Sequence, residues 1–387
     1  MAAAAPLTPL AAAPDGRWLA DVVIIGGGLH GCSTALNLAR RGVKALVIEK
    51  DYPGRHASGV NAGGVRRLGR ALPEVPLSVA SMELWHTIRD LVDDDCGFES
   101  HGQIKVAETE ADLEILRKRS ALLNSHGFAH EELIGQDELR ALLPAVAPTC
   151  VGGLISRADG AALPFRTVLA FRNAAARVGA RFLEGVPAGM PTRQGDLWRV
   201  QVGDAVVEAP VLVNAAGAWA DRIAAALGEP VPLEVIAPML MITARMPAFV
   251  TPVVGATTRT LSFKQFANGT VLVGGGYRGL ADRDRNATQL DFAKLAENAG
   301  TAAAIFPVMR DAQIMRAWAG IEARMPDDIP VIGPSGAAEA AYHAFGFSAH
   351  GFQLGPIVGS ILAELITTGA TNLPIGAFAV GRFGAGA

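Results

Sequence analysis

The fold is indicated first by Asp21-Val22-Val23-Ile24-Ile25-Gly26-Gly27-Gly28-Leu29-His30-Gly31, which Val47-Ile48-Glu49-Lys50 completes further along the chain. Residues 22–25 are short, apolar and β-branched, a pattern typical of a buried parallel strand. Gly26, Gly28 and Gly31 occupy the three positions of a G-x-G-x-x-G motif. The first glycine allows a tight turn, the second lets a pyrophosphate approach the backbone, and the third lets the following helix lie close to the strand.

The residues after this turn complete a dinucleotide-binding unit. Residues 32–41 have helical spacing, and Gly42 is well suited to end that helix. Residues 45–48 form a second apolar strand with Glu49 at its tip, close to the spacing of about 20 residues expected for the acid that binds a ribose hydroxyl. A glycine motif alone also fits an ordinary turn, but here every part of the unit is in register. The unit predicts an adenine dinucleotide, and Glu49 followed by Lys50 favours FAD or NAD over NADP.

Length and composition limit the remaining classes of protein. The chain has 387 residues, is 50% hydrophobic and 18% charged, and carries a formal net charge of −3. These values describe a globular protein of two packed domains, without the basic excess that nucleic-acid binding requires. Cys32, Cys96 and Cys150 fit no metal or redox spacing, which favours reduced thiols in a cytoplasmic protein and no metal. Residues 1–19 are predicted to be a disordered leader, and no apolar run is long enough to span a membrane.

The order of the predicted elements indicates two interleaved domains. The expected fold class is α/β, with a Rossmann-like FAD-binding domain on a mostly parallel, three-layer sheet and a second, α+β substrate domain with an antiparallel sheet. The FAD-binding domain is assigned to residues 20–90, 150–230 and 320–380, and the substrate or lid domain to 91–149 and 231–319. In the lid domain, Asn268-Gly269 between two apolar runs predicts a β-hairpin.

Three further segments carry predictions about the cofactor. Residues 54–67 are too rich in glycine for a stable helix, so they form either a floppy surface loop or backbone that lies flat on a cofactor ring. Residues 213–221 are a second place where a strand runs into small residues and the backbone must approach a ligand. A helix over 354–368 would start near His350 and Gly351, where its N-terminus can stabilise negative charge on a reduced flavin. A core-facing helix is also predicted over 77–92, and a further helix over 287–305.

These pieces together resemble the FAD-dependent amino-acid oxidoreductases of the D-amino acid oxidase superfamily. The resemblance covers nearly the whole chain and is carried by residues 55–65, 213–221, 318–333 and 346–353. It implies that the first, second and last of these segments hold FAD, and that the antiparallel domain covers the flavin ring. Residues 318–322 and 326–330 look most similar to hydroxyproline dehydrogenase and cyanide-synthase-like subunits. The residues expected to contact FAD are Gly26, Gly28, Leu29, His30, Gly31, Glu49, Lys50, Arg55, His56, Ala57, Ser58, Asn61, Ala62, Gly63, Gly64, Val186, Ala215, Gly217, Trp219, Gly320, Gly333, His350, Gly351, Phe352 and Gln353.

The chain departs from that family at positions that bear on its chemistry. Sarcosine oxidases carry a flavin-linking cysteine near the position of Gly320, so FAD is expected to be non-covalent. Their oxygen-activating lysine aligns with Gly274, which predicts a dehydrogenase with a poor rate towards oxygen. Their carboxylate-binding lysine aligns with Gln353, and the carboxylate-binding arginine of glycine oxidase aligns with Glu322.

Two arginines remain as candidates for the substrate carboxylate. The resemblance places Arg66 at a substrate arginine of sarcosine oxidases and Arg278 at a substrate histidine. Because a buried carboxylate needs a cation, we expect Arg278, beside Tyr277, to bind it, with Arg66 as the second choice. Glu322 would then face the substrate amine or a ring hydroxyl, which suits D-proline or hydroxy-D-proline better than glycine. His350 is either a capping residue or a proton-transfer residue.

The predicted reaction is oxidation of the C–N bond of a small amino or imino acid, with hydride passing from Cα to flavin N5. Three alternatives stay open: a non-catalytic or assembly subunit that binds FAD within a larger dehydrogenase, a true oxidase of the glycine or sarcosine type, and a flavoenzyme that uses a pyridine nucleotide. The expected partners are the substrate and an electron acceptor, which is a quinone, an electron-transfer protein or oxygen. A homo- or hetero-oligomer is compatible with this interpretation.

Overall fold

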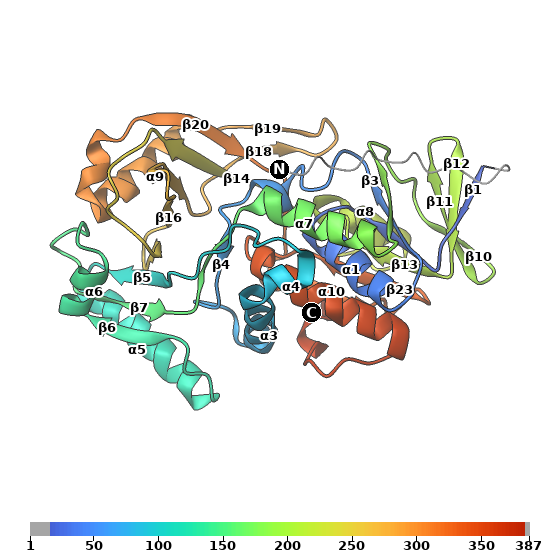
Figure 1. The fold of residues 1–387 in the computed structure, drawn as a ribbon, viewed down its shortest axis with the longest axis horizontal. Helices are drawn as coiled ribbons and strands as arrows, with labels where there is room; N and C mark the ends of the chain where they lie inside the picture. Colours follow the sequence, from blue (N-terminus) through green and yellow to red (C-terminus); the bar gives the residue numbers. More distant parts are fainter. Residues whose placement is uncertain (1–15, 384–387) are drawn as a thin grey trace.

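The computed structural model describes residues 16–383, and Figure 1 shows two sheet-containing halves side by side with the helix α10 below one of them. Most of the predicted leader, residues 1–19, lies outside the described residues. Its end differs from the prediction, because Arg17–Leu19 form strand β1, which pairs in parallel with β12 (Ala205–Ala209). The physical reason is Trp18, which is only 7% exposed and packs into the core.

The first sheet contains the predicted dinucleotide unit. Its six strands run in the order β22-β23-β13-β2-β3-β9. They span Val331–Pro334, Ala341–Phe345, Val211–Asn214, Val22–Ile25, Ala45–Glu49 and Arg181–Glu184. All neighbouring strands are parallel except β22, which is antiparallel to β23. Every residue of β2 is buried, since both faces of the sheet are covered, and this explains its unbroken apolar run.

Alternate residues of β2 face two different layers. Val22 and Ile24 pack with helices α1 (Leu29–Arg40), α7 (Pro164–Arg177) and α10 (Gly351–Thr368). Val23 and Ile25 pack against a small sheet, β1-β12-β11-β10, and against α8 (Ala220–Ala226). In that small sheet β11 spans Leu197–Val202 and β10 spans Thr192–Gln194. The three layers confirm the predicted Rossmann-like α/β class.

Helix α10 packs closely on α1. A Cβ atom on Gly355 would lie 2.3 Å from Leu29 Cδ2, and one on Gly359 would lie 2.2 Å from Ser33 Oγ. Among residues 16–383, α10 is the one helix long and apolar enough to cross a membrane, and 72% of it is buried inside the protein. Its apolar surface therefore faces α1 and the first sheet as part of the core.

The second sheet is larger and mainly antiparallel. Its main order is β19-β18-β14-β17-β16-β15-β5-β7-β6, and β20 and β21 also pair with β14. In chain order these strands are β5 (Gln103–Ala107), β6 (Glu132–Gly135), β7 (Gly152–Ser156), β14 (Glu234–Thr243), β15 (Val253–Ala256), β16 (Ser262–Gln265), β17 (Val271–Gly274), β18 (Arg278–Asp282), β19 (Ala287–Gln289), β20 (Ile314–Ala319) and β21 (Glu322–Arg324). One face packs on helix α9 (Phe292–Ile305). The predicted hairpin at Asn268-Gly269 is confirmed as the β16–β17 connection.

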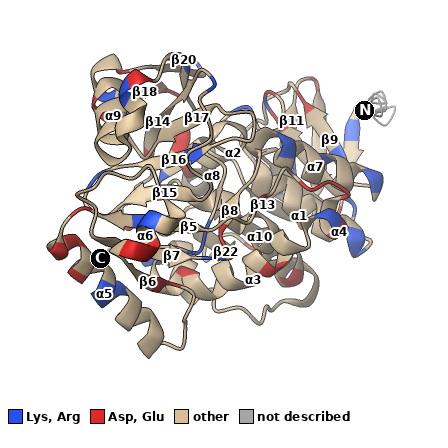
Figure 2. Ribbon diagram, turned by 60° about the vertical axis from the view of Figure 1, so that its left-hand side comes forward, with Lys and Arg blue, Asp and Glu red and all other residues tan. Residues whose placement is uncertain are grey.

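The remaining elements connect the two sheets or cover the second one. Helices α3 (Val75–His86) and α4 (Ile88–Val92) follow the glycine-rich segment, and α5 (Glu110–Ser125) and α6 (Gln136–Leu142) lie beside β5, β6 and β7. Strands β4 (Gly64–Val65) and β8 (Gly160–Ala161) form a short antiparallel pair. Figure 2 shows Lys and Arg interspersed with Asp and Glu over the ribbon, as expected for a net charge of −3.

Several local predictions differ from the structure. Residues 57–60 form a short helix, α2 (Ala57–Val60), inside the stretch predicted to be too glycine-rich for one. The helix predicted over 77–92 is divided at Thr87, where the backbone leaves the helical region. The helix predicted over 287–305 begins only at Phe292, because Asp291 caps it by accepting a bond from the Lys294 N–H.

The two sheets also divide the chain at different points from the predicted domains. Strand β7 lies in the stretch assigned to the FAD-binding domain, but it pairs with β5 and β6 in the large sheet. Strand β21 lies in the stretch 320–380, but it pairs with β14. The chain therefore leaves the large sheet a few residues later than predicted in both cases.

All three cysteines are free and buried. Among residues 16–383, no group of three His, Cys, Asp or Glu side chains is arranged to hold a metal ion. The cytoplasmic location inferred from the cysteines stays a prediction.

Candidate active site

A cavity of about 1080 Å³ lies between the two sheets. The first half of the molecule lines it with the turn before α1, the tip of β3, helix α2, the turn Gly217–Trp219 after β13, and the start of α10. The second sheet lines it with residues of β5, β14, β15 and β16. The carboxyl ends of the parallel strands β2, β3 and β13 open into this space, which is where doubly wound sheets bind ligands.

The glycine turn has no room for side chains. Gly26 has a φ of 111°, and a Cβ there would lie 2.3 Å from the Ala215 carbonyl oxygen. A Cβ on Gly31 would lie 2.0 Å from the Gly26 carbonyl oxygen, so this glycine sets the approach of α1 to β2 and does not line the cavity. A Cβ on Gly28 would lie 3.0 Å from Ser58 Oγ. The turn thus leaves a shallow backbone cradle in front of the N-terminus of α1.

Glu49 is fixed at the edge of this cradle. Its Oε2 accepts a bond of 2.7 Å from the Gly27 N–H, and its Oε1 accepts one of 2.9 Å from the Asp51 N–H. Burial raises the pKa of Glu49, while these two bonds oppose the shift. The carboxylate lines the cavity in a fixed orientation, as binding of a ribose hydroxyl would require.

Lys50 and His56 meet at a residue that the sequence did not single out. Asn286, in the loop between β18 and β19, accepts a bond of 2.7 Å from Lys50 Nζ and lies 2.7 Å from His56 Nε2. Lys50 Nζ also lies 3.3 Å from the centre of the Trp219 ring. Burial lowers the pKa of His56 to about 4, so its ring is neutral at pH 7. The second sheet therefore closes over the dinucleotide end of the cavity.

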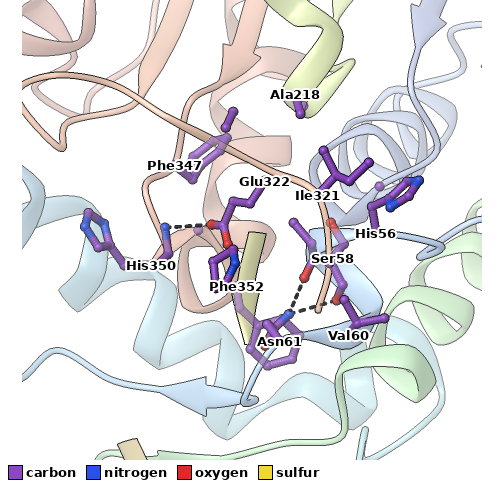
Figure 3. Close-up of a pocket in the computed structure, with 18 of the residues that line it drawn as sticks. His56, Ser58, Val60, Asn61, Ala218, Ile321, Glu322, Phe347, His350 and Phe352 are labelled. Atoms are coloured by element: carbon purple, nitrogen blue, oxygen red, sulfur yellow. Dashed lines mark hydrogen bonds between the residues drawn. The ribbon is translucent and has the colours of Figure 1, made fainter. Parts of the chain in front are cut away.

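The glycine-rich segment is ordered by its own side chains. Ser58 Oγ accepts a bond of 3.0 Å from the Leu29 N–H at the start of α1. Asn61 Nδ2 donates to the Ala57 and Ser58 carbonyls, and Asn61 Oδ1 accepts from the Gly63 N–H at 2.7 Å. Figure 3 shows Ser58, Val60 and Asn61 grouped on one side of the cavity. The segment is thus a built wall rather than a floppy loop.

Gly320 lies against this wall. A Cβ on Gly320 would lie 2.3 Å from Val60 Cγ2, and Trp318 Nε1 donates a bond of 2.9 Å to the Val60 carbonyl. The position that carries a flavin-linking cysteine in sarcosine oxidases is therefore packed against α2.

Two histidines line the cavity beside the start of α10: His30, the second residue of α1, and His350, which directly precedes α10. His30 stacks on Phe347 at 3.6 Å, and its Nε2 lies 3.1 Å from the Gly351 carbonyl oxygen. Burial lowers the pKa of His30 to about 3. His350 Nδ1 lies 3.2 Å from Glu74 Oε1, and burial lowers the pKa of His350 despite this acid. Both rings are held by protein partners, and His350 is oriented as much by Glu74 as by any ligand.

Six of the predicted site residues do not line the cavity: Gly31, Val186, Tyr277, Arg278, Gly333 and Gln353. Gln353 is fully buried, where its Oε1 accepts from Ser78 Oγ at 3.0 Å and from Arg70 Nη2 at 3.2 Å. It joins α10 to α3 and does not replace a carboxylate-binding lysine. The match in sequence between Gln353 and that lysine could not reveal that the Gln353 side chain points into the core and not into the cavity.

The two candidate arginines have different surroundings. Arg278 is ion-paired with Glu234 at 3.3 Å, is partly exposed, and does not line the cavity. Its neighbour Tyr277 packs on the α9 side of the sheet, with its hydroxyl 3.4 Å from Thr301 Oγ1. Arg66 lines the cavity and donates a bond of 2.6 Å to the Leu68 carbonyl. The expectation that Arg278 is the first choice is therefore corrected in favour of Arg66.

Glu322 lines the cavity opposite the glycine-rich wall. Figure 3 shows its carboxylate between the start of α10 and the residues of α2, and its Oε1 accepts a bond of 2.6 Å from the Ala349 N–H. Burial raises the pKa of Glu322 to about 7, against the opposing effects of that bond and of Arg278. A carboxyl group with this pKa can accept or release a proton near neutral pH.

The arrangement fits an FAD-dependent oxidoreductase, and comparison with known proteins agrees. The family model for FAD dependent oxidoreductases matches residues 21–365. The chain belongs to this family. Members of this FAD dependent oxidoreductase family bind FAD, and the cradle at Gly26–Gly28 with Glu49 beside it has the shape and donors that a dinucleotide needs.

Related proteins match this chain over nearly its whole length. A subunit of the opine oxidase of Rhizobium meliloti is 28% identical over 94% of this chain and 98% of its own. The hydrogen cyanide synthase subunit HcnC of Pseudomonas aeruginosa is 26% identical over 94% and 96%. The crystal structure of L-proline dehydrogenase from P. horikoshii superposes with a TM-score of 0.88 at 27% identity, covering 95% of this chain and 98% of its own. The chain is therefore an FAD-dependent enzyme that oxidises amino-acid-type substrates.

Proposed function

We propose that this enzyme oxidises the Cα–N bond of a secondary amino acid, with D-proline and hydroxy-D-proline as its simplest candidate substrates, and that it works as a dehydrogenase. The proposal rests on one observation: Arg66 and Glu322 line the same cavity as the dinucleotide cradle. When bound, FAD supplies the hydride acceptor, N5 of its ring. The remaining steps are assigned to the chain's own side chains.

Arg66 is the proposed anchor of the substrate carboxylate. An arginine offers a planar, bidentate match to a carboxylate. Burial of the Arg66 guanidinium lowers its pKa, against the opposing effect of nearby acids. Among residues 16–383, Arg66 forms no ion pair within 4.0 Å, although Asp159, Glu74 and Glu131 are near enough to raise its pKa. A substrate carboxylate would supply the missing partner.

Glu322 is the proposed partner of the substrate amine. A secondary ammonium must lose its proton before hydride can leave Cα, and a carboxylate with a pKa of about 7 can take that proton at neutral pH. Its Oε1 is already held by the Ala349 N–H, so Oε2 is the atom assigned to the proton. Walls such as Ile321 and Phe352 keep this end of the cavity apolar.

The residues proposed to hold FAD are those that line the first half of the cavity. The cradle Gly26–Gly28 faces the pyrophosphate, Glu49 the ribose, and the start of α10 at Gly351 the flavin ring. Non-covalent binding is part of the proposal, since Gly320 offers no side chain for a link.

The chain is proposed to be the FAD-bearing subunit of an oligomer that passes electrons to a separate acceptor. Several relatives are named as subunits of larger enzymes, namely the opine oxidase relative, HcnC and the β subunit of sarcosine oxidase. The competing candidate is a subunit in which FAD has a purely structural role. Reduction of the flavin by an amino acid would support the catalytic role over the structural one.

The test combines a substrate panel with matched arginine variants. Anaerobic addition of sarcosine and of D- and L-forms of proline, hydroxyproline and alanine should bleach the flavin absorbance of the purified protein with at least one secondary amine. Arg66→Met should lower kcat/KM for that substrate about 30- to 5000-fold, which corresponds to about 2–5 kcal/mol, and should leave the flavin content unchanged. Arg117→Met is the control, since this arginine on α5 is exposed, is ion-paired with Glu114 and does not line the cavity, and it should stay within about threefold of the wild type. An equal loss in both variants, or no bleaching at all, would refute the assignment.

A further inference from the structure

Most of the cations that line the cavity have a carboxylate partner in the protein. Arg70 lies 3.8 Å from Glu74, and Arg283 donates to Asp221 at 2.6 Å. The other paired cations are Lys50 with Asp51, Arg222 with Asp284, and Arg259 with Glu108. Within residues 16–383, three cavity-lining cations have no such partner: Arg55, Arg66 and Lys105.

Arg55 belongs to the dinucleotide end of the cavity. It lies close enough to Lys50 and His56 to lower the pKa of each, although burial is the larger cause in both. The pyrophosphate of a bound dinucleotide would bring two negative charges to this end, and these would balance the positive charge of Arg55. Arg55 therefore needs no further ligand.

Lys105 and Arg66 are neighbours at the other end. Burial lowers the pKa of Lys105, and the positive charge of Arg66 is the next largest cause. Lys105 is half-buried on β5, and the residues opposite it on the adjacent strands are Gly255 and Leu154, neither of which can pair with it. No hydrogen bond or ion pair joins Lys105 Nζ to any of residues 16–383.

The cavity therefore presents two neighbouring cations without an ion-pair partner, Arg66 and Lys105, and one acid without an ion-pair partner, Glu322. A single substrate carboxylate would pair with only one of these cations, and the second positive charge would stay beside it with only the more distant charge of Glu131 acting on both. A ligand with one ammonium and two carboxylates matches all three groups. Gln103, two residues from Lys105 on the same face of β5, adds an amide to the same region of the wall.

We propose that the preferred substrate is a secondary amino acid that carries a second carboxylate, which Lys105 binds while Arg66 holds the carboxylate on the reacting carbon. This rests on the proposed function and narrows its substrate class. Lys105 acts on specificity, since it contacts a part of the substrate that does not react. Simple monocarboxylates such as D-proline then remain substrates of lower affinity.

The test measures binding of two ligands that cannot be oxidised, pyrrole-2-carboxylate and pyrrole-2,5-dicarboxylate. Their Kd values for the FAD-loaded protein are obtained by isothermal titration calorimetry and by the perturbation of the flavin spectrum. We expect the dicarboxylate to bind roughly 10- to 100-fold more tightly than the monocarboxylate. Lys105→Met should reduce this ratio to near one, and Lys105→Arg should restore most of it. Lys118→Met, a change of the same kind at a lysine that is 76% exposed on α5, should keep the wild-type ratio.

The outcomes separate this inference from the proposed function. A wild-type ratio near one, or an equal loss of both ligands in Lys105→Met, overturns the inference, since Lys105 would then assist Arg66 on a single carboxylate or play no part. The proposed function stands in that case if a monocarboxylic secondary amine bleaches the flavin. A large, Lys105-dependent ratio together with no bleaching by any amine would uphold the site and refute the oxidation.

Discussion

Glu322 shows how one residue's environment sets its role. Its carboxyl group lies in a cavity wall with a single backbone donor, so burial dominates and the pKa rises to about 7. Glu49 lies in the same cavity but accepts two backbone N–H bonds, which oppose the effect of burial and keep it suited to hydrogen bonding. The two acids therefore have different tasks although both face the same space.

The pH dependence of the reaction should report Glu322. Because the pKa is raised, the group is protonated below about pH 7 and cannot take a proton from the substrate ammonium. We expect kcat/KM of the wild type to fall as the pH decreases through about 7. Glu322→Gln should lose this step while keeping the flavin spectrum. A Gln variant with an unchanged acid limb would assign that limb to another group, with His350 as the next residue to replace.

At the scale of elements, the turn between β2 and α1 is the proposed cradle for the cofactor. Its glycines serve different purposes: Gly26 and Gly31 allow the strand, the turn and the helix to meet, and Gly28 keeps the front of α1 open. The first two are packing requirements that would hold without any ligand. Of the three glycines, only Gly28 is placed so that an added Cβ would point towards Ser58 in the cavity wall.

Gly28→Leu should therefore abolish cofactor binding without unfolding the protein. The added side chain would meet Ser58 Oγ and fill the place of the pyrophosphate. We expect colourless protein with a far-ultraviolet circular dichroism spectrum like that of the wild type. Gly376→Ala is the control, because a Cβ there meets nothing within 4 Å. A yellow Gly28→Leu protein with normal FAD content would place the cofactor elsewhere.

At the scale of the whole molecule, the cavity proposed to hold the cofactor lies where the two sheets meet, so the attachment of FAD is expected to depend on both. We expect FAD to be released completely by acid precipitation, since Gly320 packs against Val60 and has no side chain to form a link. The yellow colour should appear entirely in the supernatant, as measured by absorbance near 450 nm. Colour that stays with the precipitated protein would indicate a covalent bond.

The large sheet leaves no room for a lysine at the position of Gly274, which bears on the expected reaction with oxygen. Leu240 fills the space beside Gly274, where a Cβ would lie 2.2 Å from Leu240 Cδ2, so no cation occupies this position. We expect stopped-flow reoxidation by air to be slow compared with turnover in the presence of a quinone or dye. Fast reoxidation would instead make Lys264 the candidate for the oxygen-activating lysine. This buried lysine, whose pKa burial lowers to about 8, has its Nζ 3.0 Å from where a Gly63 Cβ would lie.

The dinucleotide unit, the fold class and the cofactor could all be predicted from the sequence. These rest on local rules: four apolar residues make a buried strand, glycines at fixed offsets make the turn, and an acid ends the next strand. Each rule acts over a few residues, so neighbouring residues suffice to recognise it. The alternation of Gln103 and Lys105 with Ile104 and Val106 was also a readable signal, since it places both polar residues on one face of β5.

The choice of cations that face the substrate depends instead on tertiary packing. The sequence favoured Arg278 over Arg66, but the pairing of β18 with β14 brings Arg278 beside Glu234, outside the cavity. Arg66 and Lys105 become neighbours because the segment after α2 packs near β5, which lies in the other sheet. The cause is physical: the charge that a cavity presents depends on which side chains are already neutralised, and that is settled by contacts between segments far apart in the chain.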